Sequence, residues 1–259
     1  MRMRRKKHGA ERIAACAEML IASPEDLLGN PSAPFGDRRG TPREALPLCL
    51  EIGCGKGSFA CGLTAKEPDI NLIAMERVAD VACLALEKAR DSADTRPNNL
   101  RFIIGDARNL ADYFPESSLD RIYINFCDPW TKKGYTKRRL TYRAFLEIYR
   151  RILKDGGRLI FKTDNEALFD FSVDEFRAAE LEFVFTSRDL HSSERAENNV
   201  VTEYEASFSS QGMPIYCAEV IFDKRVPAYM AELESDKKKS ENIINSEMPD
   251  KSESHEEQL

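Results

Sequence analysis

Short apolar runs of β type alternate with amphipathic stretches through the middle of the chain. We predict strands over the apolar runs at residues 48–52, 70–75, 100–104, 121–126, 158–162, 182–186 and 215–222. Strands that alternate with helical stretches are typical of a mostly parallel sheet with helices on both faces. The pattern therefore predicts an α/β fold built on a seven-stranded sheet.

Two of the helices can be placed from apolar residues that recur every three or four positions. One apolar face is formed by Val78, Val81, Ala82, Ala85 and Ala89. Another is formed by Phe145, Ile148, Tyr149, Ile152 and Leu153. We expect this second helix to end at Gly156 and Gly157, because glycine favours helix C-termini.

The last two predicted strands, 182–186 and 215–222, leave room between them for no more than a short helix at 202–209. A parallel connection needs a crossover of a dozen or more residues, usually a helix of ordinary length. We therefore predict one antiparallel strand in the edge region of the sheet.

The chain divides into three parts by composition. Residues 1–46 combine a basic arm, a short helix and a proline-rich irregular connection. Residues 47–226 hold all seven predicted strands and form a single domain. Residues 227–259 are polar and rich in lysine and glutamate, so we expect a disordered tail there.

Composition excludes several classes of protein. No apolar run approaches the length of a membrane span and no signal peptide is present, so we expect a cytoplasmic protein. Seven scattered cysteines without a CxxC pair suit neither a disulfide framework nor a zinc site. We expect reduced cysteines, mostly small core residues, and no metal. Composition leaves monomer and homodimer both open.

The net charge of −6 is unevenly distributed along the chain. Residues 231–259 carry nine acids and four lysines, whereas residues 132–151 carry eight bases and one acid, and residues 1–12 carry six bases and one acid. Phosphate groups sense the local field more than the net charge. The two basic patches are therefore candidate nucleic-acid contacts, although solvated surface charge is the alternative explanation.

A glycine-rich turn directly follows the first predicted strand, with Gly53, Gly55 and Gly57 spaced as GxGxG. Such a turn lets a nucleotide approach the backbone, but it can also be a tight loop or a dinucleotide site. Ser58 stands where the third glycine of a dinucleotide motif would fall. Glu51 precedes the turn, where a carboxylate would tolerate a cationic sulfonium better than a pyrophosphate.

Two further acids follow the next two predicted strands. Glu76 lies about 20 residues beyond the turn, where a carboxylate can accept both hydroxyls of a ribose. Asp106 ends the third strand, close to where the adenine amino group would lie. With the glycine turn, the three acids resemble the cofactor site of Rossmann-like class I S-adenosylmethionine-dependent methyltransferases.

The segment 125–140 follows the fourth predicted strand and contains Asp128, Pro129 and Trp130 before a run of lysines and arginines. The basic run can reach phosphates, and Trp130 and Tyr135 can stack on bases. A core position for Trp130 is the alternative.

This segment, together with residues 1–7, 50–57, 162–164 and 202–205, closely resembles the bacterial tRNA (guanine-N7-)-methyltransferase family over residues 1–225. The resemblance implies transfer of a methyl group from S-adenosyl-L-methionine to N7 of a guanosine in tRNA, at position 46 of the variable loop. It implies Asp128 as the catalytic residue. The cofactor-binding residues would be Glu51, Gly53, Gly55, Gly57, Glu76, Asp106 and Asp128. The substrate-binding residues would be Lys132, Asp164, Thr202, Glu203, Tyr204 and Glu205. The RNA-contacting residues would be Gly134, Tyr135, Thr136, Lys137, Arg138 and Arg139.

Three other functions remain open at this point. An NAD-dependent dehydrogenase would use the same sheet and glycine turn, but Ser58 and Glu51 disfavour it. A methyltransferase that modifies an exocyclic amine would share a motif like Asp128-Pro129-Trp130. A tRNA-binding scaffold without turnover would keep the fold and lose the acids or glycines, all of which are present here.

Overall fold

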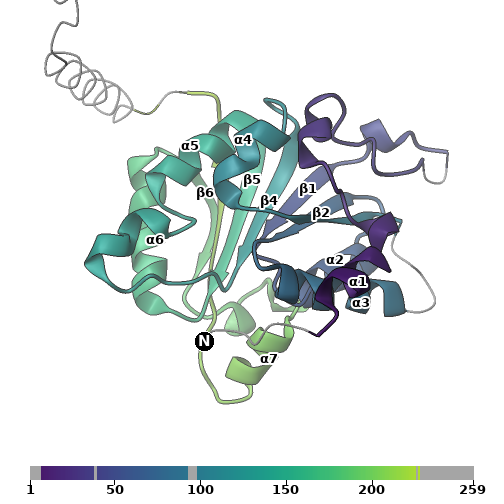
Figure 1. Cartoon of the computed structure of the whole chain (residues 1–259). Coiled ribbons are helices and arrows are strands. Elements are labelled where there is room, and N and C mark those ends of the chain that lie inside the picture. Colours follow the sequence, from purple (N-terminus) through teal and green to yellow (C-terminus); the bar gives the residue numbers. More distant parts are fainter. Residues whose placement is uncertain (1–6, 38–39, 93–97, 226, 228–259) are drawn as a thin grey trace, which may run out of the picture.

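The computed structural model describes residues 7–37, 40–92, 98–225 and 227 (Figure 1). Seven strands form one sheet in the order β3-β2-β1-β4-β5-β7-β6. The strands are β1 (Leu48–Ile52), β2 (Asn71–Glu76), β3 (Leu100–Ile104), β4 (Leu119–Asn125), β5 (Leu153–Thr163), β6 (Glu182–Ser187) and β7 (Tyr216–Phe222). The predicted α/β fold is confirmed, with a strand at each predicted position.

Strands β1 to β5 pair in parallel, and β7 is antiparallel to both of its neighbours, β5 and β6. The predicted antiparallel strand in the edge region is thus confirmed. The strand order reverses between β1 and β4, and ligands of open α/β sheets bind at such a switch point, outside the carboxyl ends of the strands.

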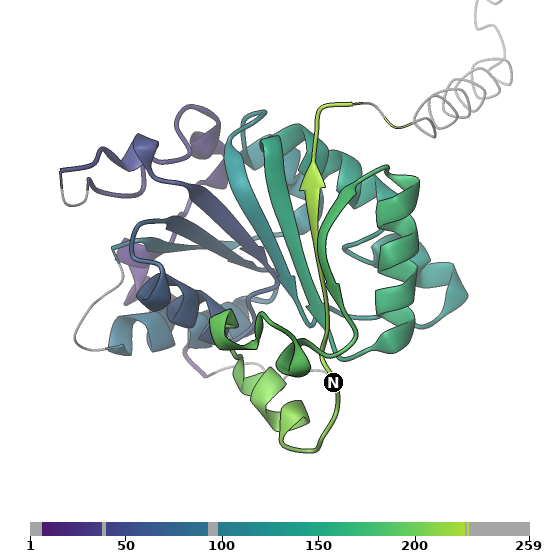
Figure 2. The same cartoon turned by 180° about the vertical axis from the view of Figure 1, so that it is seen from behind.

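Helices cover the sheet on both faces (Figures 1 and 2). They are α1 (Gly9–Ala14), α2 (Ser58–Lys66), α3 (Ala79–Asp91), α4 (Leu110–Tyr113), α5 (Arg143–Ile152), α6 (Glu166–Ala178) and α7 (Glu203–Ser209). Successive side chains of a strand point to opposite faces of the sheet, so alternate residues belong to two hydrophobic cores, one on each face. Ile122 and Ile124 pack with α4, α5 and α6, whereas Tyr123 between them packs with α2 and α3.

The predicted end of the second helix is wrong. α5 ends at Ile152, and Gly156 and Gly157 lie inside β5, which begins at once because Leu153 pairs with Leu119 of β4. Gly156 has a φ of 76°, and a Cβ on Gly157 would lie 2.8 Å from a backbone oxygen, so glycine fits both positions at the start of β5, where the register with β4 shifts.

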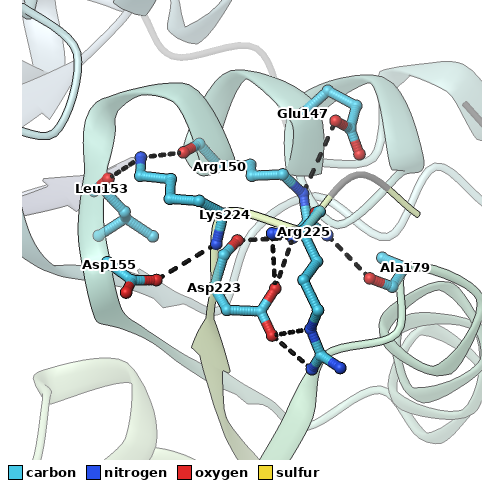
Figure 3. Close-up of polar contacts among 8 residues, drawn as sticks. All are labelled: Glu147, Arg150, Leu153, Asp155, Ala179, Asp223, Lys224 and Arg225. Atoms are coloured by element: carbon cyan, nitrogen blue, oxygen red, sulfur yellow. Dashed lines mark hydrogen bonds and ion pairs between the residues drawn. The ribbon is translucent and has the colours of Figure 1, made fainter.

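A lysine, and not a glycine, satisfies the carbonyl groups at the end of α5. The ammonium of Lys224, just beyond β7, donates to the backbone oxygens of Arg150 at 2.8 Å and Leu153 at 2.6 Å (Figure 3). Lysine side chains are one of the known ways to satisfy helix C-termini. The signal lies some 70 positions away along the sequence, which explains why local pattern missed it.

The N-terminal part packs on the sheet domain through α1. Arg12 donates to Glu87 of α3 at 2.7 Å. The backbone amide of Ile21 donates to the carbonyl of Phe102 in β3 at 2.9 Å. In the described residues of the connection that follows, the helical elements are the short 3-10 turns η2 (Pro24–Leu28) and η3 (Arg43–Ala45). The predicted boundaries at 46 and 226 stay predictions, and the basic arm at 1–6 and the tail from 228 lie outside the described residues.

Five of the seven cysteines are buried, as expected of small core residues. Within the part of the chain that the structure describes, no helix has both the length and the apolar character needed to cross a membrane.

Candidate active site

A cavity of about 770 Å³ opens at the carboxyl ends of β1 to β4. Three of the predicted acids, Glu76, Asp106 and Asp128, line it together with Gly53 and Gly55. These residues come from four different strand ends. The structure therefore brings most of the predicted cofactor site to one place.

The three glycines of the turn have φ values of 79°, 56° and 77°, a region that favours glycine. Their surroundings differ. A Cβ on Gly53 or Gly55 would meet no atom within 4 Å, whereas a Cβ on Gly57 would lie 2.9 Å from the Cβ of Ala85. Gly53 and Gly55 thus keep the cavity floor open, and Gly57 lets α2 start close against α3.

Glu51 lies behind the cavity wall and does not line it. Its side chain is 1% exposed, and its Oε1 accepts a hydrogen bond of 3.2 Å from Nδ2 of Asn125. The other carboxylate oxygen, Oε2, and the amide oxygen of Asn125 find no partner among the described residues. Burial raises the pKa of Glu51 to about 7, although Asn125 and the charge of Lys162 act in the opposite direction.

Glu76 is held by backbone amides. Its Oε2 accepts from the amide of Gly55 at 3.1 Å and its Oε1 from the amide of Val78 at 2.9 Å. These bonds aim the carboxylate along the cavity wall, between the glycine turn and α3. Glu76 is the last residue of β2 and lines the cavity, and its contact with a ribose stays a prediction.

Asp106 caps the short helix η4 (Ala107–Asn109) and pairs with Arg108. Its Oδ1 accepts from the Arg108 amide at 3.0 Å, and its Oδ2 accepts from Nη2 of Arg108 at 2.9 Å. The hydrogen bond from the arginine side chain lowers the pKa of Asp106. Asp106 therefore shares its carboxylate with Arg108, an arginine that the sequence pattern did not single out.

The segment after β4 has an unusual backbone. Phe126 and Trp130 have φ values of 53° and 42°, although neither is glycine. Left-handed non-glycine residues are uncommon and cluster at functional sites. Between them, Asp128 is exposed at the cavity wall and makes no hydrogen bond within the described residues. Burial raises the pKa of the Cys127 thiol to about 12, so Cys127 is neutral and no nucleophile.

Trp130 is half-buried on the cavity wall, so the core alternative does not describe it. The guanidinium of Arg138, in the 3-10 turn η5 (Lys133–Arg138), lies 5.1 Å from the Trp130 ring and 4.5 Å from the Tyr135 ring. Lys137 and Arg138 also line the cavity. A stack of cation and aromatic rings thus stands at one side of the opening.

Arg139 points inward, unlike its basic neighbours. It donates to the backbone oxygens of Pro129 at 2.9 Å and Trp130 at 3.4 Å, and its guanidinium lies 4.3 Å from the Phe171 ring. These contacts hold the shape of the loop. The contact of Arg139 with RNA stays a prediction, and the hydrogen bonds that the structure shows for the Arg139 side chain are within the loop.

The second predicted substrate segment lies beside the same opening. Tyr204 of α7 is 48% exposed, its hydroxyl donates to Oδ2 of Asp164 at 3.5 Å, and its ring lies 5.1 Å from the Phe126 ring. Phe126 in turn lines the cavity. Tyr204 and Asp164 therefore extend the wall beyond β4 and β5.

The other residues of that segment point elsewhere. Thr202 and Glu205 form the capping box of α7, and Glu205 is 0% exposed, paired with Lys162 at 2.9 Å. Glu203 pairs with Lys88 of α3 at the surface. Lys132 is exposed at the start of the basic loop. Of the residues 202–205, Tyr204 alone points toward the opening, whereas the other three hold α7 against the rest of the protein.

Relatives of known description match almost the whole sheet domain. A family profile described as "Putative methyltransferase" matches residues 45–218. The chain is 46% identical over 220 residues to a tRNA (guanine-N(7)-)-methyltransferase of Clostridioides difficile (strain 630), covering 85% of this chain and 98% of that protein. A protein of the same description from Bacillus subtilis (strain 168) is 40% identical over 220 residues, with the same coverage. The chain belongs to the tRNA (guanine-N7-)-methyltransferase family.

Solved structures agree with this assignment at the level of the fold. An antibiotic-related methyltransferase superposes with a TM-score of 0.52 at 16% identity, covering 70% of this chain and 89% of the other. The 16S rRNA methyltransferase KamB gives 0.52 at 11% identity with the same coverage. Membership of this family excludes the dehydrogenase alternative.

Sequence reasoning missed four residues that the site of this family member contains. Asn125 and Phe126 belong to the segment quoted for the family, but only the structure shows the first bonded to Glu51 and the second under Tyr204. Arg108 could not be linked to Asp106 without the turn between them. Lys162 did carry a signal, because a lysine inside an apolar strand is rarely buried without a partner.

Proposed function

We propose that this chain transfers a methyl group from S-adenosyl-L-methionine to N7 of a guanosine in tRNA. The observation that carries the proposal is the convergence of Glu76, Asp106 and Asp128 on one cavity beside a basic, aromatic loop. By resemblance the target is position 46 of the variable loop. We expect the protein to act in the cytoplasm and to need no metal.

The residues present suit a cationic nucleoside cofactor. The partnerless oxygen of Glu51 is a buried acceptor next to the glycine turn, and Gly53 and Gly55 leave open space where side chains would stand. Glu51, Glu76, Asp106 and Asp128, with Gly53, Gly55 and Gly57, would hold it. When bound, S-adenosylmethionine supplies an electrophilic methyl group on its sulfonium.

The protein's own contribution is alignment and charge. N7 of guanine has a lone pair and no proton, so no general base is needed to make it a nucleophile. Holding two reactants in line can contribute on the order of 7 to 11 kcal/mol. The product ring is cationic, and Asp128, without a partner of its own, can stabilise that charge as it develops.

Recognition of guanine would come from the wall beside Asp128. Guanine offers donors at N1 and at its exocyclic amine, which a carboxylate such as Asp164 can accept. Tyr204 and Phe126 supply aromatic faces next to that carboxylate. Lys132 and the segment Thr202, Glu203, Tyr204 and Glu205 complete the proposed substrate site, with Glu205 acting from inside the protein.

The RNA itself would lie on the loop Gly134, Tyr135, Thr136, Lys137, Arg138 and Arg139. Lys137 and Arg138 are exposed and can neutralise phosphates, while Arg139 holds the loop in shape. A base within folded RNA must turn outward to reach the cavity, as is common for enzymes that modify bases.

The test is incubation of the purified protein with labelled S-adenosylmethionine and unmodified tRNA, followed by nucleoside analysis. We expect 7-methylguanosine as the labelled nucleoside. Asp128→Ala should lose at least about 100-fold in turnover, since it removes preorganised charge stabilisation, and should keep tRNA binding. Asp174→Ala on the exposed side of α6 is the matched control.

Two outcomes would overturn the proposal. Label on an exocyclic amine would favour the alternative class of nucleic-acid methyltransferase. tRNA binding without any labelled product would favour a scaffold that has kept the fold. Near-normal turnover by Asp128→Ala would remove that residue from the mechanism.

A further inference from the structure

A lysine buried at the end of β5 connects the cofactor side of the site with α7. Lys162 is 3% exposed, yet its ammonium has three acceptors: Oδ1 of Asn199 at 3.0 Å, the backbone oxygen of Val200 at 3.0 Å and Oε2 of Glu205 at 2.9 Å. A lysine has three N–H donors, so all of them are used. Every acceptor belongs to the segment 199–205.

The acceptors are themselves tied together. Asn199 accepts from Lys162 and donates to Glu205, while Glu205 accepts from the amide of Thr202 at 3.4 Å and closes the capping box of α7. The His191 ring nitrogen Nε2 lies 3.1 Å from Glu205 as well. The start of α7 is therefore built around one buried carboxylate whose counter-ion comes from β5.

The ammonium also lies close to one wall of the active site. It is 5.2 Å from the Phe59 ring of α2 and 5.8 Å from the Phe126 ring. Phe126 lines the cavity and packs against Tyr204, and Asp164 follows Lys162 by two residues. A shift of Lys162 would thus move both the aromatic wall and the carboxylate proposed to bind guanine.

We propose that Lys162 is a positioning residue for the methyl acceptor: its ammonium locks residues 199–205 onto β5 so that Tyr204 and Asp164 stand at the cavity mouth. This inference rests on the proposed function for its kinetic test. It assigns Glu205 to the lock and leaves contact with the base to its neighbours.

The variant must remove the contact without leaving a buried charge. Lys162→Met alone leaves the buried Glu205 without its lysine counter-ion, which is strongly destabilising. Lys162→Met with Glu205→Gln removes both charges, and glutamine can still accept within the capping box. The matched control is Lys154→Met with Asp120→Asn, a lysine–carboxylate pair of 2.8 Å at the opposite end of the same strand.

Three measurements test the lock: steady-state kinetics with tRNA, binding of S-adenosylhomocysteine by calorimetry, and hydrogen exchange of the α7 amides. In the double variant we expect KM for tRNA to rise about tenfold or more, because small misplacements of binding groups are costly. The Kd for S-adenosylhomocysteine should stay within about threefold, because Glu76 and Asp106 are held by hydrogen bonds that do not involve residues 199–205. Exchange in α7 should be faster, and the control pair should resemble the unaltered protein throughout.

An unchanged KM for tRNA together with unchanged exchange in α7 would overturn the proposal. So would faster exchange with an unchanged KM, because that result leaves Lys162 with a structural role only. If the unaltered protein did not methylate tRNA, the proposed function would fail by itself, and the exchange of α7 would still report on the lock.

Discussion

At the scale of single residues, the buried carboxylate of Glu51 is the most informative group in the site. An ionised carboxylate without a full set of partners is costly in the interior. Burial accordingly raises the pKa of Glu51 from its usual value of 4.5 to about 7. The residue is thus poised between its charged and neutral forms where a cationic cofactor would bind.

This shift predicts a pH dependence of cofactor binding. A cation near Glu51 favours its ionised form, so binding near pH 7 should release about half a proton per cofactor. We expect the Kd for S-adenosylmethionine to fall about tenfold from pH 6 to pH 8 in the unaltered protein relative to Glu51→Gln, which cannot titrate. Calorimetry in two buffers of different ionisation enthalpy measures both the Kd and the released proton. Glu182→Gln, on exposed β6, should keep the unaltered profile.

The same residue predicts an opposite effect on stability. A raised folded-state pKa means that the contribution of Glu51 is fully present below about pH 4.5 and is lost as pH rises through about 7. Without ligand, Glu51→Gln should therefore be more stable than the unaltered protein at pH 8, by at most about 3 kcal/mol. Urea unfolding at pH 5 and pH 8 checks this. Equal stability at pH 8 would mean that Glu51 is ionised at no cost.

Residue types could be predicted further than residue directions. The acids at strand ends were visible because parallel strands bring their carboxyl ends to one edge, and Glu76, Asp106 and Asp128 do meet there. Glu205 and Arg139 were visible as charges in motifs, but not as inward-pointing groups. Their partners, Lys162 and the Pro129 backbone, come from tertiary structure that spacing along the chain does not reveal.

At the scale of elements, strands followed the sequence closely and helix ends did not. β1 and β3 have the predicted bounds, because their short runs of mostly apolar residues lie buried inside the sheet. α5 ended early because Leu153 enters the sheet and Lys224 satisfies the helix carbonyls. The end of that helix is decided by β4 and by the residues after β7, neither of which lies near it in sequence.

The basic loop after Asp128 predicts how tRNA binding depends on salt. Lys133 and Lys137 are exposed, and no hydrogen bond from either ammonium is seen in the described residues. Lys133→Glu with Lys137→Glu should weaken tRNA binding and reduce the slope of log K against log salt by about 2, roughly one for each phosphate contact. Filter binding between 50 and 200 mM salt, on the order used for such slopes, measures this. Arg177→Glu on α6 is the control, and an unaltered slope in the double variant would place the RNA elsewhere.

At the scale of the whole molecule, the two ends of the parallel strands differ in function. The cavity, α7 and the basic loop lie at the carboxyl ends of the parallel strands. At the other end of the sheet, residues 223–225 after β7 contact the end of α5 (Figure 3). There the buried guanidinium of Arg150 donates to the backbone oxygens of Asp223 at 2.8 Å, Arg225 at 3.0 Å and Ala179 at 2.8 Å. One side chain thus fastens α5, the end of α6 and the last strand together.

This division predicts a substitution that changes stability without changing the site. Arg150→Ala leaves a void and removes the donor to the buried carbonyl of Ala179 and to the part-buried carbonyls of Asp223 and Arg225, so we expect a loss of about 3 kcal/mol. For a domain of this size that loss lowers Tm by roughly 10 °C. Thermal unfolding followed by circular dichroism measures it, and Arg177→Ala on the surface should cost no more than about 0.5 kcal/mol.

Well below Tm, Arg150→Ala should bind S-adenosylhomocysteine with an unaltered Kd, because the cavity lies at the other end of the strands. A weakened Kd at unchanged Tm would mean that the two ends of the strands are coupled. The coupling would run through β5, which contains Lys162 and pairs with β7.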